Sequence, residues 1–167
     1  MMKSTFLITL LLSLLLTNYA FATGGTSCAI DDSKIKITVN LANGHIFGAP
    51  LVANSTVQIK FKRRTVSGFS TYTFEKSGNL NEIPYWFNLN DELKLGAYAE
   101  PTQYANGNQV NGFVTLSAVI EAKWFSDESD EYGGYYAGVY TVTESRYLAP
   151  FGQKEQKFQG FIKCYTE

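Results

Sequence analysis

The chain has 167 residues, with 14 basic and 15 acidic side chains, so its net charge is close to zero. Such a chain has no bulk electrostatic attraction to nucleic acid or to an anionic membrane, and neither is expected as a partner. Aromatic residues make up 15 % of the sequence, and many of them fall in strand-like runs, where flat side chains suit a pleated, half-buried surface.

The N-terminus reads as a secretory signal peptide. Lys3 precedes an apolar run over residues 6–16, and Ala20-Phe21-Ala22 supplies a small-x-small cleavage pattern. The run is short for a membrane span. We therefore predict a signal peptide at 1–22, a single domain at 23–167 without a transmembrane segment, and a secreted, periplasmic or cell-surface location. A lipoprotein anchor at Cys28 is the alternative, although Gly25-Thr26-Ser27 lacks the usual aliphatic position.

Two cysteines, Cys28 and Cys164, lie near the ends of the predicted domain. In an exported chain two cysteines most simply form a disulfide. The alternative is a pair of thiols at a metal, which would need further ligands, and His45 is the only histidine. The favoured pairing would tie the start of the domain to its last strand.

Alternation of apolar and polar residues predicts strands along the rest of the chain. Asn43-Gly44 is typical of a turn, and Gly48 with Pro50 makes residues 46–53 an edge or a connection. Residues 100–108 read as a loop. The predicted strands cover 34–41, 55–62, 69–74, 83–89, 92–99, 112–125, 135–143 and 157–165.

The longest alternation, residues 112–125, is followed by an acidic break, Gly133-Gly134 and a second strand-like run. Together they predict a β-hairpin with a long tip. Neither strand can bury its apolar face alone, so other strands must cover it. We therefore predict an all-β fold, an antiparallel β-sandwich or flattened barrel of about seven to nine strands, with Cys164 pointing into the core.

Catalytic patterns are sparse. His45 follows a predicted turn and is expected to face solvent, and the sequence carries neither a glycine-rich phosphate loop nor a histidine-based metal motif. Paired carboxylates could still catalyse hydrolysis, because they meet only in space. The available acidic residues include Asp91, Glu92, Glu100 and Glu121. The sequence leans against an enzyme.

The hairpin tip and its flank carry the most distinctive polar residues. Two interpretations fit Asp127, Glu128, Asp130 and Glu131: a calcium site, or a solvated tip kept soluble by its charge; their spacing is not that of an EF-hand. Beside them lies a tyrosine cluster whose rings could stack on a glycan or a protein. Because alternate residues of a strand face opposite sides, Tyr135 is expected to face away from Tyr136 and Tyr140. The cluster comprises Tyr132, Tyr135, Tyr136 and Tyr140.

The basic residues Lys60, Lys62, Arg63 and Arg64 could dock a polyanion such as an acidic polysaccharide, or could form a solvated face. Asn54-Ser55-Thr56 is a glycosylation sequon. Taken together, the sequence favours a non-enzymatic extracytoplasmic domain that binds a protein or a glycan through loops and aromatic residues. The alternatives are a subunit of a surface assembly joined by strand addition and a carboxylate-based hydrolase.

Overall fold

The structure is a computed structural model. It describes residues 24–46, 49–77, 80–89, 91–101, 104–105, 108–109, 112–129, 133–148 and 150–166. Within these ranges, the backbone alone is described for 43–46, 49–53, 86–89, 104–105 and 108–109. The predicted signal peptide lies outside the described residues.

The described chain is made of strands, and the predicted all-β antiparallel fold is confirmed. Ten strands form one sheet in the order β5-β4-β3-β2-β1-β12-β11-β10-β7-β6, and β8 pairs with β9. The strands are β1 (Gly24–Asp31), β2 (Ile35–Ile46), β3 (Ala49–Phe61), β4 (Thr71–Ser77), β5 (Leu80–Asn81), β6 (Tyr85–Leu89), β7 (Glu92–Ala99), β8 (Tyr104–Ala105), β9 (Asn108–Gln109), β10 (Gly112–Ser126), β11 (Gly134–Leu148) and β12 (Gly152–Thr166).

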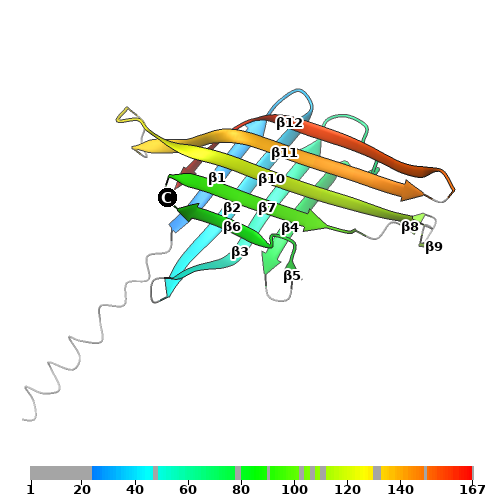
Figure 1. Cartoon of the computed structure of the whole chain (residues 1–167), viewed down its shortest axis with the longest axis horizontal. Coiled ribbons are helices and arrows are strands. Elements are labelled where there is room, and N and C mark those ends of the chain that lie inside the picture. The colour runs from blue at the N-terminus through cyan, green and yellow to red at the C-terminus, as the bar shows by residue number, and fades with distance from the viewer. Residues whose placement is uncertain are drawn as a thin grey trace, which may run out of the picture.

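The sheet curls on itself into a flattened half-barrel. Figure 1 shows strands β1–β4 crossing behind β6, β7 and β10–β12 at a steep angle. Near the seam between the two edges of the sheet, the backbone amide of Tyr98 donates to the carbonyl of Glu82 at 2.7 Å. The two halves therefore face each other as the layers of a sandwich do, while remaining one hydrogen-bonded sheet.

A single core fills the space between the halves. The predicted hairpin is confirmed as β10 and β11, which pair without interruption from Gly112–Leu148 to Ser126–Gly134. Their alternate residues point inward, as a period of two requires. The largest fully buried apolar side chains come from six strands and the β5–β6 connection: Tyr140, Phe74, Ile35, Ile37, Ile59, Ile83, Leu93, Leu95, Leu116, Ile120 and Val39.

Strand β1 was not predicted, because Gly24, Gly25, Thr26 and Ser27 show no apolar alternation. Pairing on both sides creates this strand, with β2 along its whole length and with β12 near its start. The predicted disulfide is confirmed: Cys28 stands directly opposite Cys164 in the β1–β12 register, and the bond joins residues 136 positions apart. Both cysteines are buried, so Cys164 does point into the core.

Three local predictions were wrong. Residues Asn43 and Gly44 belong to β2 rather than to a turn, because they pair with Val52 and Leu51 of β3. Residues 49–53 are accordingly part of a long strand. A register shift between Asn40 and Ala42 lets the pair continue. The predicted 100–108 loop contains the short strand β8, which pairs with β9.

Tyr140 connects the two halves through the interior. Its ring is 1 % exposed and its hydroxyl donates to the Asp32 carboxylate in the β1–β2 turn at 2.5 Å. Burial raises the pKa of Tyr140, and the hydrogen bond to Asp32 raises it further. The ring lies over Gly160 of β12, where an added Cβ would come within 2.6 Å of a ring carbon. Glycine on one strand therefore makes room for tyrosine on its neighbour.

No helix in the described residues is long and apolar enough to cross a membrane. The disulfide fits an oxidising, extracytoplasmic environment.

Candidate functional site

The half-barrel has a polar end near the β11–β12 turn. Here the inward positions that are apolar in the middle of the sheet become Glu144 and Arg146 on β11, and Lys154 and Gln156 on β12. Arg146 stands directly opposite Lys154 in the register. Since inward positions of a strand normally pack the core, charged residues there mark the end of the core and the start of an opening.

The β3–β4 loop forms the opposite wall of this opening and is fixed to β11 by Glu144. That carboxyl group is fully buried and accepts hydrogen bonds from the Val66 amide at 2.7 Å and the Ser67 hydroxyl at 2.5 Å. Within the loop, the Thr65 hydroxyl donates to the carbonyl of Phe69 and accepts from the Gly68 amide. Contacts spanning 77 and 78 residues therefore hold the wall in place without any ligand.

Three cations converge on the opening: Arg64 from the loop, Arg146 from β11 and Lys154 from β12. None of them forms an ion pair with an acidic residue of the described chain. The Nε atom of Arg146 is buried and has no hydrogen-bond partner among the described residues. A guanidinium that is partly removed from water without a counter-charge is unfavourable, so this arrangement suits an anion supplied from outside.

We name this opening the cationic mouth and define it by Arg64, Val66, Arg146, Phe151, Lys154 and Gln156, which line a space of about 800 Å³. Phe151 lies in the β11–β12 turn and is 81 % exposed. A flat ring beside cations can stack on a sugar ring while the cations bind its acidic groups. The mouth thus combines an apolar platform with positive charge.

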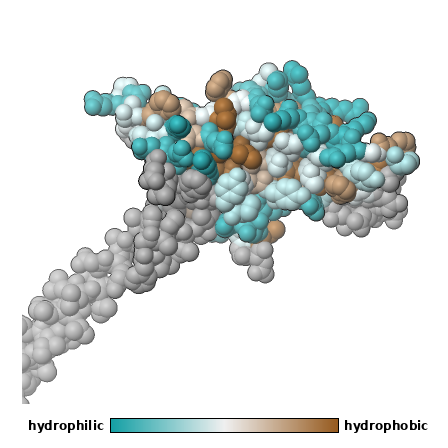
Figure 2. Space-filling model, in the orientation of Figure 1, coloured by the Kyte–Doolittle hydropathy of each residue, from teal (hydrophilic) through white to brown (hydrophobic). Residues whose placement is uncertain are grey.

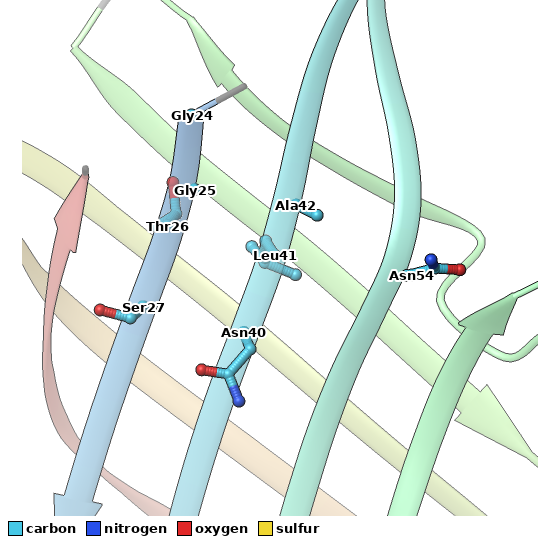
Figure 3. Close-up of a pocket in the computed structure, with 8 residues that line it drawn as sticks. All are labelled: Gly24, Gly25, Thr26, Ser27, Asn40, Leu41, Ala42 and Asn54. Atoms are coloured by element: carbon cyan, nitrogen blue, oxygen red, sulfur yellow. The ribbon is translucent and has the colours of Figure 1, made fainter. Parts of the chain in front are cut away.

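Two other depressions are weaker candidates. Figure 3 shows one on β1, β2 and β3, of about 240 Å³, lined by Gly24, Gly25, Asn40 and Asn54 among others. It carries no charged side chain, and in Figure 3 the amides of Asn40 and Asn54 point apart rather than toward one ligand position. The other depression, of about 460 Å³, lies on the outer face of β7, β10 and β11.

The structure separates the predicted tyrosine cluster. Tyr136 and Tyr140 are buried in the core, 6 % and 1 % exposed, and Tyr136 packs edge-on against Trp124. Tyr135 lies on the outer face, stacked on Phe125 with ring centroids 5.9 Å apart. The opposite facing expected from alternation is confirmed, and the Nζ atom of Lys163 lies 3.6 Å from the centroid of the outward Tyr135 ring. Tyr132 lies outside the described residues.

The calcium prediction stays a prediction. Asp127 accepts hydrogen bonds from the amide and hydroxyl of Ser129 at 3.0 and 2.6 Å, and Glu128 is exposed. Hydrogen bonds from the Ser129 side chain and amide lower the pKa of Asp127. Asp130 and Glu131 lie outside the described residues, and within the described part no three potential metal-binding residues cluster.

The structure places the residues of the predicted basic cluster in different surroundings. Lys62 is bound to the carboxylate of Asp31 and donates to the carbonyl of Asp32, whereas Arg64 reaches the mouth. Lys60 and Arg63 are exposed. Asn54 is exposed and has a positive φ of 50°. The side chain of His45 lies outside the described residues.

Two of the four candidate catalytic carboxylates share one surface, since Glu92 and Glu121 both line the depression on the outer face of β7, β10 and β11. Glu92 forms an ion pair with Lys94 at 3.1 Å, and Glu100 accepts a hydrogen bond from the hydroxyl of Tyr98. Asp91 and Glu121 are exposed. No direct interaction joins Glu92 to Glu121 among the described residues, and Lys94, which forms the ion pair with Glu92, also stands opposite Glu121 in the β7–β10 register.

Arg146, Lys154 and Phe151 were not predicted as site residues. They fall at or beyond the ends of the predicted strands, and each is ordinary in its local sequence. Only the β11–β12 register and the return of the β3–β4 loop bring them together with Arg64. One feature of the sequence could have indicated them. If the alternation of Tyr140 and Val142 is continued along the strand, the charged residues Glu144 and Arg146 fall at inward positions.

Comparison of the chain with known protein families, with curated proteins and with solved structures found no match.

Proposed function

We propose that this chain is a non-enzymatic extracytoplasmic binding domain that holds an anionic glycan at the cationic mouth. The observation that carries the proposal is the convergence of Arg64, Arg146 and Lys154 without a counter-charge, one of them with a buried and unpartnered nitrogen. Uronic acids and sulfated sugars carry the carboxylate or sulfate that such groups bind, and a pyranose ring is the size that an exposed phenylalanine stacks on.

The fixed wall supports a binding role over a catalytic one. The mouth is assembled before any ligand arrives, since Glu144 already accepts hydrogen bonds from the loop. Both of its oxygens are engaged in that way, so it serves as an anchor rather than as an available acid or base. Preformed sites bind with little ordering cost.

A surface-assembly subunit is supported less well. Strand addition requires a free donor strand or an accessible gap in the sheet. Strand β1 lies between β2 and β12 and is joined to β12 by the disulfide, so the described N-terminal strand is not a free donor.

Calorimetric titration with uronic-acid oligosaccharides, sulfated oligosaccharides and neutral oligosaccharides of equal length tests the proposal. Wild type should bind an acidic series and not the neutral one, and affinity should fall as salt rises, because the contacts are charge-based. Arg146→Met should weaken binding at least tenfold. Lys60→Gln, which also removes one positive charge but lies outside the mouth, should bind as wild type does. Equal binding of neutral and acidic sugars, or binding of neither, would reject the proposal.

A further inference from the structure

The outer face of β10, β11 and β12 carries a protruding ring beside a shallow depression. Phe161 of β12 is 86 % exposed, the most exposed of the large apolar side chains in the described chain. Its register partner on β11, Val139, is 47 % exposed and also lines the outer depression. Figure 2 shows apolar surface as a narrow band between hydrophilic areas on the face turned to the viewer.

The depression beside this ring has an apolar floor. Ala137, Gly138 and Val139 of β11 form it together with Ala122 of β10, and Phe125 closes one end. Its volume is about 460 Å³. Ala137 is the small outward-facing side chain that leaves the hollow, while Ala122 and Gly138 stand at inward positions of the register, and the hollow lies one strand away from the residue that protrudes.

The rim of the depression is balanced in charge. Glu121 stands opposite Lys94, and Lys123 stands opposite Glu92, in the β7–β10 register. Two acidic and two basic residues thus alternate around the floor. A second copy of the same face would meet no net like-charge repulsion there, whereas a strongly charged partner of either sign would gain little.

We infer that this face is a self-association surface, at which Phe161 of one copy occupies the outer depression of a second copy. A two-fold interface requires a surface that complements itself. A protruding group and a hollow that lie next to each other on one face meet this requirement, because half a turn about an axis that lies in the interface and passes between them places each ring over the other copy's hollow. An exposed aromatic anchor seated in a pocket is also the usual centre of binding energy in an interface. This inference is independent of the cationic mouth.

Sedimentation velocity from low micromolar to millimolar concentration tests the inference, using the mature chain with its disulfide. Wild type should shift from monomer to dimer with rising concentration. Phe161→Ser, which removes the protruding ring, and Ala137→Glu, which places a charge on the floor, should each stay monomeric while keeping the far-ultraviolet spectrum and thermal midpoint of the wild type. Phe151→Ser is the matched control: this residue is nearly as exposed at 81 % but lies in the β11–β12 turn, and the variant should dimerise normally.

Because the contact is apolar, the dimer should also tolerate salt that weakens binding at the mouth. A wild type that remains monomeric at millimolar concentration would overturn the inference. So would a dimer that survives both Phe161→Ser and Ala137→Glu, or binding of a sugar to this face in a monomeric wild type.

Discussion

The two ends of the half-barrel are built on different principles. At one end the Cys28–Cys164 bond joins the neighbouring strands β1 and β12, and Trp124 packs on Tyr136, so covalent and apolar contacts hold this end closed. At the other end Glu144 binds a loop across the interior, and Arg146 has no ion-pair partner among the described residues. The first arrangement favours stability. The second keeps unmatched charge in a prepared opening, which lowers stability and is typical of a binding site.

Removal of the disulfide should have the largest effect on this comparison. The bond closes a loop of 136 residues, for which the chain-entropy estimate is about 5 kcal/mol of unfolding free energy. The variant Cys28→Ala/Cys164→Ala should therefore unfold at a much lower urea concentration than the oxidised wild type. Reduced wild type serves as the control and should match the double variant. Equal urea midpoints for oxidised wild type and double variant would show that the closed end owes its stability to packing alone.

Glu144→Ala should produce the next largest loss, at the opposite end. The substitution leaves the Val66 amide and the Ser67 hydroxyl without their acceptor, and we expect a cost of about 3 kcal/mol in urea unfolding. Limited proteolysis should also cut the β3–β4 loop faster. Glu155→Ala, on the exposed side of β12, is the control and should change little. A similar small effect from both variants would mean that Glu144 does not anchor the wall.

Tyr140→Phe examines the link between the two halves. It keeps the ring over Gly160 but removes the hydrogen bond to Asp32, which should cost about 1 kcal/mol at neutral pH. Burial alone would raise the pKa of Asp32, but hydrogen bonds from Tyr140 and from the amides of Lys34 and Ile35 outweigh it and lower the pKa.

The sign of the pH dependence follows from that lowered pKa. A carboxylate with a depressed folded-state pKa contributes stability above its unfolded pKa, near 3.9, and loses it as pH falls through the folded value. The difference between wild type and Tyr140→Phe, measured by urea unfolding at several pH values, should therefore shrink in acid. A constant or growing difference below pH 4 would contradict this assignment.

Arg146→Met should have the smallest effect on stability and the opposite sign. It removes a buried unpartnered nitrogen and a charge near Lys154, so the unfolding free energy should rise by about 0.5–1 kcal/mol. Lys60→Gln, at an exposed position, should stay within a few tenths of a kcal/mol of wild type, as surface substitutions usually do. A variant that is both less stable and still able to bind acidic sugars would show that Arg146 is a structural residue.

The alternation of residues and the positions of the cysteines were sufficient to predict much of the disulfide-bonded end of the molecule. Local alternation predicts the β10–β11 hairpin and the inward position of Cys164. The expectation that two cysteines of an exported chain pair predicts the bond to Cys28. Strand β1 was not predicted because its first residues are small or polar. It is formed by its pairing with β2 and β12. The Asn43-Gly44 signal was overridden by pairing with β3.

The cationic mouth was largely beyond the sequence. Only Arg64 belonged to a predicted cluster, and its neighbours Lys60 and Lys62 point to other surroundings. Arg146 and Lys154 are brought together by the β11–β12 register. The β3–β4 loop is held beside them by the hydrogen bond from Val66 to Glu144, which are 78 positions apart in the sequence. Local patterns do not contain distances of this kind, so a site assembled from separate strands and a loop needs the fold.

The most direct test of the central claim is a titration followed by two-dimensional amide NMR of the isotopically labelled mature chain. With an acidic oligosaccharide that binds in calorimetry, the account predicts saturable shifts concentrated at Val66, Arg146 and residues 151–156, and none at the depression lined by Gly25 and Asn40. Shifts centred on that depression or on the outer face of β10–β12, with the mouth unchanged, would contradict it.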